Sequence, residues 1–262
     1  MITCERNSQH TFFGVSALLF ASSATITILW CRSMSAMGGM EMPGGWTMSM
    51  TWMPGQSRPV AAASFLAMWS VMMVAMMLPS LLPMLLRYRH AVSRSGEKRL
   101  GRLTTLVGAG YFFVWTMLGV ITFPLGVELA SLEMQRPEFA RAAPTAAGMV
   151  VLIAGVLQFT EWKARNLGCC RETLFFDGRL AADLGTSWRH GLRLGIHCVY
   201  ACAGLTAILL VIGVMDLRAM ALMGAAITAE RLAPSGVRVA RIIGALVLVA
   251  GLILVVRGAV LA

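Results

Sequence analysis

The sequence predicts an all-α membrane protein, a polytopic bundle of about seven transmembrane helices, with six as the alternative. Hydrophobic residues make up 58% of the 262-residue chain. Charged residues make up only 13%, whereas a typical soluble domain has about 25%. The apolar residues form runs long enough to cross a bilayer. Most basic residues stand between these runs, as expected for the loops of a membrane protein.

Charge and motifs argue against several function classes. The formal net charge is +10, but the positions of the basic residues are explained by membrane topology. No aromatic-basic patch suggests stacking on bases, so we expect no nucleic-acid partner. The chain also lacks a nucleophile elbow, a phosphate-binding loop and a zinc-protease motif. We therefore expect no enzymatic activity.

The first apolar run covers residues 12–30 and is predicted to be a signal-anchor helix. It is long for a signal peptide and has no convincing cleavage site after it, although a cleaved signal peptide is the alternative. Residues 31–62 follow as a glycine-, proline- and methionine-rich loop. Seven methionines lie in it: Met34, Met37, Met40, Met42, Met48, Met50 and Met53. The expected organisation is 1–62, the anchor with this extracytoplasmic loop, and 63–262, the transmembrane bundle.

Six further apolar runs are predicted to be helices, over residues 63–86, 103–127, 142–160, 194–215, 219–232 and 242–256. The run at 219–232 is short, and if it only re-enters the membrane the protein has six spans. The loops 87–102 and 163–193 are strongly basic and lie two spans apart, so both are placed in the cytoplasm. The N-terminus and the arginines at 231, 238 and 241 then fall on the cytoplasmic side, and the methionine-rich loop falls outside.

Methionines share one face of the helix expected at 63–86. The residues at helical spacing on this face are Trp69, Met72, Met73, Met76 and Ser80. Pro79 is expected to kink the helix, with the kink facing protein rather than lipid. A kinked, thioether-rich helix that packs inward could form the wall of a soft-metal site. The alternative is that methionine serves only as adaptable packing material.

The helix at 194–215 carries the second set of candidate ligands. Cys198 and Cys202 are four residues apart, so both thiols face one way. His197 lies about 100 degrees round the helix from Cys198 and could stand beside that face. Thiolate, imidazole and thioether together favour Cu(I), with zinc as the less favoured metal. Alternatively, the cysteines are small buried apolar residues.

Depth in the membrane supports combining these helices. Counted from the cytoplasmic surface, Cys202 lies about 12 Å deep and Met76 about 15 Å deep, so they are level if their helices touch. Cys169 and Cys170 fall in the cytoplasmic loop near the mouth of this site. A disulfide is not expected in that reducing compartment, which leaves free thiols or a role in metal entry.

The outer loop and two glutamates complete the candidates. Thioethers bind Cu(I) without deprotonation, so the methionine-rich loop could capture or release the metal, or it could simply lie on the membrane. Glu161 and Glu230 stand at the cytoplasmic ends of their helices. There we expect a headgroup contact or an arginine partner rather than a functional carboxylate.

Several motifs occur in a characteristic order: A-M-M-L-P-S at 75–80, Q-F-T-E-W-K-A-R-N-L-G-C-C-R at 158–171, H-C at 197–198 and G-V-M-D-L at 213–217. Over about residues 60–235 the chain thereby resembles a bacterial family of predicted metal-binding integral membrane proteins, a domain of unknown function. The resemblance implies a multi-span protein of the inner membrane with a copper-related metal site. Asn166 and Ala201 stand where that family's pattern has cysteines, which argues against a four-thiolate site.

The leading hypothesis is a membrane protein that binds Cu(I) for copper handling or the assembly of a copper enzyme. The proposed ligands and neighbours are Cys198, Cys202, His197, Met73, Met76 and Cys170. Its expected partners are the lipid bilayer, the metal ion and a copper enzyme or membrane complex. The alternatives are a secondary transporter, which could carry the metal itself, and a non-catalytic structural subunit of a membrane complex.

Overall fold

The computed structural model describes residues 2–36, 40–42, 46–48, 57–93, 99–172 and 183–261. Helices contain nearly all of these described residues, so the predicted all-helical bundle is confirmed. The helices are α1 (Ile2–Ala36), α2 (Arg58–Ser93), α3 (Leu100–Gln135), α4 (Pro137–Leu157), α5 (Glu161–Glu172), α6 (Leu184–Ile212), α7 (Leu217–Leu232) and α8 (Gly236–Leu261).

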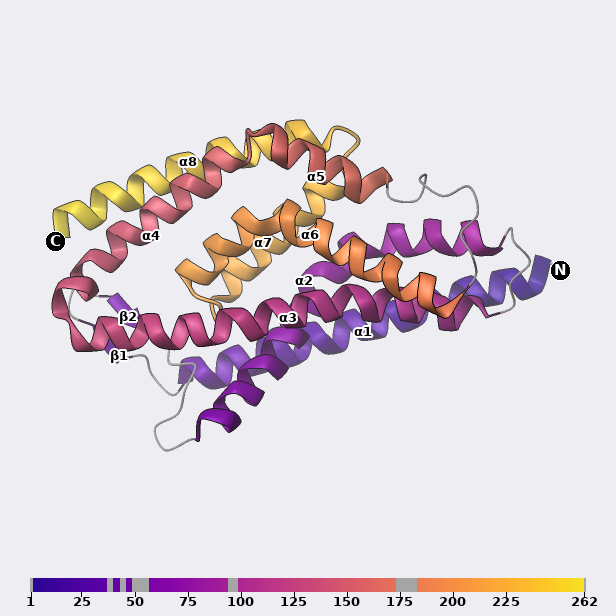
Figure 1. The fold of residues 1–262 in the computed structure, drawn as a ribbon, viewed down its shortest axis with the longest axis horizontal. Helices are drawn as coiled ribbons and strands as arrows, with labels where there is room; N and C mark the ends of the chain where they lie inside the picture. The colour runs from indigo at the N-terminus through magenta and orange to yellow at the C-terminus, as the bar shows by residue number, and fades with distance from the viewer. Residues whose placement is uncertain are drawn as a thin grey trace.

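The helices form two connected groups (Figure 1). Helices α1, α2 and α3 pack together on one side, while α4 and α8 run side by side in opposite directions along the other. Between them lie α6, which packs on α3, α4 and α5, and α7, which packs on α2 and α8. The central position of α6 and α7 brings residues from five other helices around them.

Five described helices are long and apolar enough to cross a membrane, and a sixth span is possible if α4 and α5 count together. The five are α1, α2, α3, α6 and α8. This number is close to the predicted total of about seven with six as the alternative. The weakest predicted span corresponds to α7, whose 16 residues fall short of the about 20 that cross a bilayer as a helix.

The predicted cytoplasmic loop at 163–193 is partly helical, which corrects the sequence-based assignment. Helix α5 covers the first part of that loop and is bent by 65° from α4, at the short break between residues 157 and 161. Helix α5 was not predicted because its hydrophobicity is low, since five of its twelve residues are charged. The bend turns α5 onto α6 and so brings Lys163 into the core.

The predicted outer loop contains a short antiparallel hairpin of β1 (Met40–Met42) and β2 (Trp46–Met48). In its register Met40 pairs with Met48 and Met42 pairs with Trp46. Met37, Met50 and Met53 lie outside the described residues, as do the side chains of the strand methionines. The proposed capture of metal by this loop therefore stays a prediction.

The core forms where α2, α3 and α6 pack closely. The expected inward face of α2 is buried: Trp69, Met72, Met73, Met76 and Ser80. Trp69 donates a hydrogen bond from Nε1 to the Trp115 carbonyl of α3, at 2.8 Å. On the other side of α3, a Cβ at Gly195 of α6 would lie only 3.0 Å from the Tyr111 carbonyl oxygen. Glycine therefore lets α6 approach α3 closely at the level of Cys198.

Candidate metal centre

Two thiols lie together in the centre of the bundle. Cys198 and Cys202 are one helical turn apart on α6, and their Sγ atoms are 3.8 Å apart. Their residues are 0% and 1% exposed, and both are free cysteines. Sulfur atoms at this separation can converge on one soft cation with small side-chain rotations, without any backbone movement.

Tyr111 of α3 holds one of these thiols. Its hydroxyl Oη lies 2.9 Å from Cys198 Sγ, and the side chain is fully buried. The close approach of α6 at Gly195 brings the two residues within this distance. A tyrosine hydroxyl that donates to sulfur stabilises the thiolate over the thiol, because a hydrogen bond to the charged form favours that form.

Arg231 of α7 brings a positive charge to the same thiol. Its Nη1 lies 3.0 Å from Cys198 Sγ, 3.2 Å from Tyr111 Oη and 3.1 Å from Ser80 Oγ. The residue is only 3% exposed. A guanidinium beside a cysteine favours the thiolate, which is the form that binds metal.

A thioether from α2 lies on the other side of Arg231. Nη2 of the guanidinium is 3.4 Å from Met84 Sδ, and Met84 is buried. Arg231 therefore touches both a thiol and a thioether. The described part of the site offers two thiols with a thioether one guanidinium away, a donor set that suits Cu(I) better than a hard cation.

A buried ion pair fixes the helix that carries Arg231. Glu230 accepts hydrogen bonds from Lys163 Nζ at 2.6 Å and from Gln158 Nε2 at 3.0 Å. Lys163 also donates to the Ala201 carbonyl, the residue before Cys202, at 2.5 Å. The pair ties α7, α5 and α6 together, so Arg231 and the thiols are held in one position relative to each other.

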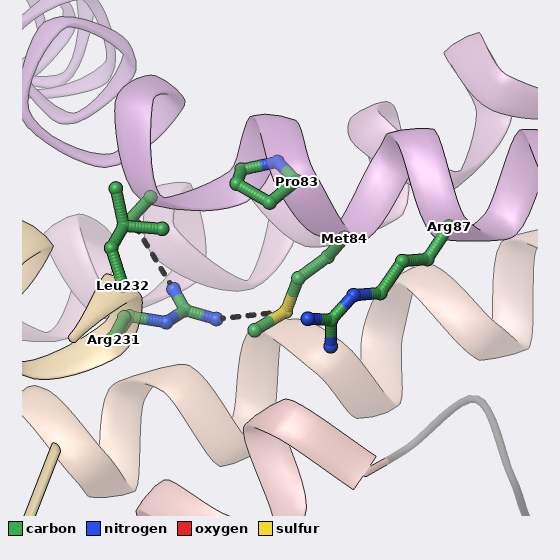
Figure 2. Close-up of a pocket in the computed structure, with 6 residues that line it drawn as sticks. Pro83, Met84, Arg87, Arg231 and Leu232 are labelled. Carbon is green, nitrogen blue, oxygen red and sulfur yellow. Dashed lines mark hydrogen bonds between the residues drawn. The ribbon is translucent and has the colours of Figure 1, made fainter. Parts of the chain in front are cut away.

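A cavity of about 140 Å³ opens between α2 and α7, next to the site. It is lined by Ser80, Pro83, Met84, Arg87, Arg231 and Leu232. Figure 2 draws the Met84 thioether between the guanidinium groups of Arg231 and Arg87. Arg87 is exposed and Leu232 is 48% exposed, whereas Arg231 is buried. The cavity therefore leads from the surface to the arginine that contacts Cys198.

The other predicted ligands are less closely associated. His197 is half-buried, and its buried Nδ1 has no hydrogen-bond partner among the described residues. Met73 and Met76 are buried on α2, and Met76 packs near Gly224 of α7. The contacts described around the thiols include none of these three. Cys170 belongs to α5, but its side chain lies outside the described residues, as does that of Cys169.

The helix contact assumed for Met73 and Met76 occurs elsewhere on α2. The side-chain contacts described between α2 and α6 join Tyr88 to Ser187, at 2.8 Å, and Tyr88 to His190, by ring stacking. Within the described ranges, no group of three or more His, Cys, Asp and Glu side chains is placed to hold a metal ion.

Three residues at this site, Arg231, Tyr111 and Met84, were not predicted from the sequence, each for a different reason. Arg231 was assigned to a cytoplasmic end with Arg238 and Arg241, although it is buried. Tyr111 lies in an apolar helix without a motif around it, and Met84 lies beyond the predicted methionine face. Glu230 has a buried lysine partner rather than a headgroup or an arginine. The sequence did contain a signal for Arg231. Glu230 and Arg231 are adjacent charged residues in an apolar run, and placing charged side chains in a membrane costs free energy, so such residues usually have a function.

Comparison with known proteins gives one family. A family model described as "PpoB2: Copper chaperone" matches residues 66–254 of the chain. The match includes α3, α6 and α7 and most of α2, so all the residues described around the thiols lie within it. Searches of curated proteins and of solved structures gave no match.

Proposed function

The chain belongs to the PpoB2 copper chaperone family, and on this basis we propose that it is an integral membrane protein that binds Cu(I) at Cys198 and Cys202. The observation that carries the proposal is the buried thiol pair, with Sγ atoms 3.8 Å apart and a guanidinium 3.0 Å from Cys198. Copper is the cargo, which the protein receives and passes on.

The donor chemistry favours the reduced ion. Thiolates and thioethers are soft ligands, and Cu(I) accepts low coordination numbers that two sulfurs can provide. Structural Zn²⁺ needs four ligands in a tetrahedron, and the described residues offer no group of three or more of its usual side chains. Cu(I) is thus the preferred cargo and zinc the less favoured one.

The surface of the bundle supports its place in a membrane. Large apolar side chains are exposed on the outer helices, including Leu18 at 72%, Leu246 at 67% and Leu125 at 65%. Soluble monomers rarely expose large contiguous apolar patches. We propose a multi-pass protein of the bacterial inner membrane with a cytoplasmic N-terminus, because the basic segments 87–102 and 163–193 lie on one side when α4 and α5 count together as one span.

The proposed role involves ligand exchange and no covalent reaction. A chaperone takes Cu(I) from a donor and gives it to an acceptor, and the partner of this chain would be a copper enzyme or a membrane complex that assembles one. The hydrogen bonds around Cys198 come from Tyr111 and Arg231. Both can be re-formed when the metal leaves, which suits reversible binding. We propose that the protein is not an enzyme.

Copper content tests this proposal. The protein is purified anaerobically in detergent, loaded with Cu(I), freed of loosely bound metal and compared with the Cys198→Ser/Cys202→Ser variant. The matched control is Cys31→Ser, which removes a different buried cysteine, on α1. We expect stoichiometric copper in the wild type and in the control, and its loss in the double variant. Copper retained by a folded double variant, or absent from the wild type, would contradict the proposal.

A further inference from the structure

We propose that the cavity between α2 and α7 is a docking pocket for a small anionic thiol that carries Cu(I), and that copper enters the protein there. This inference rests on the proposed Cu(I) site at Cys198 and Cys202. The ligand is defined by its chemistry: a thiolate that holds the copper and a carboxylate that the pocket recognises. The pocket is lined by the six residues Ser80, Pro83, Met84, Arg87, Arg231 and Leu232.

The lining is suited to a carboxylate. Two of its six residues are arginines and none is acidic. Arg87 is exposed at the mouth, and Arg231, 3% exposed, is at the inner end. A guanidinium binds a carboxylate through two parallel hydrogen bonds, and such charge-assisted bonds strengthen where water is excluded. Two arginines at different depths can attract an anion and then hold it.

The pocket also leads to the metal site. Arg231 spans the distance, with Nη2 3.4 Å from Met84 Sδ in the pocket and Nη1 3.0 Å from Cys198 Sγ behind it. Copper delivered into the pocket would meet the Met84 thioether before the thiol pair. A soft ligand between the mouth and the final site offers an intermediate position for Cu(I).

The volume limits the size of the carrier. The cavity measures about 140 Å³, close to the engineered cavity of about 150 Å³ that holds one benzene molecule. A carboxylate-bearing arm of a small molecule fits such a space, whereas a folded donor protein does not. The pocket therefore selects a low-molecular-weight carrier.

Transfer then balances as a ligand exchange. The bond between copper and the carrier sulfur breaks, and bonds from copper to Cys198 Sγ and Cys202 Sγ form. Cys198 enters as the thiolate beside Arg231, and the proton of the Cys202 thiol passes to the released carrier thiolate. Copper remains Cu(I), so no oxidant or reductant is required. The carboxylate of the carrier stays on the arginines until the exchange is complete.

The test compares two copper donors. Loading of the purified protein is followed after mixing with the Cu(I)–glutathione complex, which carries carboxylates, or with Cu(I) in acetonitrile, a neutral complex. The test variant is Arg87→Gln, and the matched control is Arg238→Gln, which removes an exposed arginine from the first turn of α8. Copper-free S-methylglutathione, which has the carboxylates but no thiol, serves as a competitor.

We expect Arg87→Gln to slow transfer from glutathione about tenfold, because a hydrogen bond to a charged group is lost. Transfer from acetonitrile should slow much less, and Arg238→Gln should leave both rates unchanged. S-methylglutathione should inhibit only the glutathione reaction. The proposal that the carrier docks in this pocket would be overturned by any of three results: equal effects of the two arginine variants, equal slowing of transfer from both donors by Arg87→Gln, or no inhibition by S-methylglutathione. Failure of the wild type to load from either donor would overturn the copper site itself.

Discussion

Arg231 is the residue that links the thiols to the rest of the protein. Its guanidinium contacts Cys198, Tyr111, Ser80 and Met84, which come from α6, α3 and α2. Burying a cation is costly, and a bundle keeps one only where several partners compensate for lost hydration. In the proposed Cu(I) site, this charge would stabilise the thiolate of Cys198.

Replacement of Arg231 by methionine is expected to weaken Cu(I) binding about tenfold or more. The variant removes a charge-assisted hydrogen bond to Cys198 Sγ, and without that bond the sulfur is more often protonated. Titration against a competing Cu(I) chelator measures the affinity. Arg238→Met, at an exposed position, is the control. Identical affinities for the wild type and Arg231→Met would mean that the guanidinium has no part in metal binding.

At this scale the sequence predicted pairs along one helix better than contacts between helices. The spacing of Cys198 and Cys202 places both thiols on one face, and the structure has them 3.8 Å apart. Which residues of other helices meet that face depends on helix packing, for which four-residue spacing carries no information. Tyr111 and Met84 could therefore not be assigned to the site. Met73 and Met76 were chosen because they share the inward face of their helix and because Met76 lies at a depth similar to that of Cys202.

At the scale of elements, α5 is the feature that shapes the site most. The 65° bend after α4 lays this charged helix against α6 and brings Lys163 to Glu230. The ion pair is nearly inaccessible, with side-chain exposures of 6% and 2%. Such a pair adds little net stability when intact, but the loss of one partner leaves an uncompensated charge.

We expect Glu230→Gln to destabilise the protein by about 3–5 kcal/mol, because Lys163 loses its counter-charge. Replacing both partners, as Lys163→Met/Glu230→Leu, should restore much of the loss. Thermal unfolding in detergent measures both effects. Glu161→Gln is the control, since the Glu161–Arg165 pair is exposed and contributes little. A Glu230→Gln protein as stable as the control would contradict a structural role for the pair.

The contact between α4 and α8 depends on glycines at several levels. A Cβ at Gly251 would lie 2.9 Å from the Leu152 nitrogen, and one at Gly155 would lie 2.9 Å from Leu248 Cδ2. Small residues at such positions let two helix backbones approach and increase their van der Waals contact in a membrane.

Gly251→Leu should therefore lower the midpoint of thermal unfolding, because the larger side chain forces α8 away from α4. Gly126→Leu on α3 is the matched control, since a Cβ there meets no atom within 4 Å. Equal midpoints for the two variants would show that α4 and α8 do not pack as described.

The position of the long helices could be predicted because apolar runs are a strong signal over twenty residues, although α1, α2, α3 and α6 are longer than the predicted runs. The predicted helix boundaries were less accurate where charged segments are helical. Helix α3 continues to Gln135, past the predicted end at Val127, and α5 lies in a segment that charge alone marks as a loop. Helix α5 packs on α6 and α7, and a hydropathy pattern does not contain such tertiary contacts.

At the scale of the whole molecule, the exposed apolar surface is suited to a nonpolar solvent such as a lipid bilayer. Exposed side chains such as Leu18, Ile121, Ile242 and Leu252 lie on α1, α3 and α8. We expect the protein to remain in the membrane pellet after alkaline carbonate extraction, which removes peripheral proteins. A soluble control protein expressed in the same cells should appear in the supernatant. Release of this protein into the supernatant would contradict the proposal that its helices span the bilayer.

The outer helices and the central helices of the bundle carry different kinds of residues. The outer helices α1, α4 and α8 present much of the apolar surface. The central helices α6 and α7 carry the thiols, Glu230 and Arg231, and the Lys163 partner of Glu230 comes from α5. The pocket between α2 and α7 connects this interior with the exposed Arg87. The proposed function requires a sheltered site for Cu(I) and a path to it, and the buried thiols and the pocket beside Arg231 are the candidates for these two parts.

X-ray absorption at the copper edge of the Cu(I)-loaded protein tests the central claim most directly. Binding by Cys198 and Cys202 predicts a first shell made only of sulfur, with fewer sulfur neighbours in a Cys202→Ser variant and an unchanged spectrum in Cys31→Ser. A first shell of nitrogen or oxygen atoms, or a spectrum that Cys202→Ser leaves unaltered, would place the copper elsewhere and contradict the account.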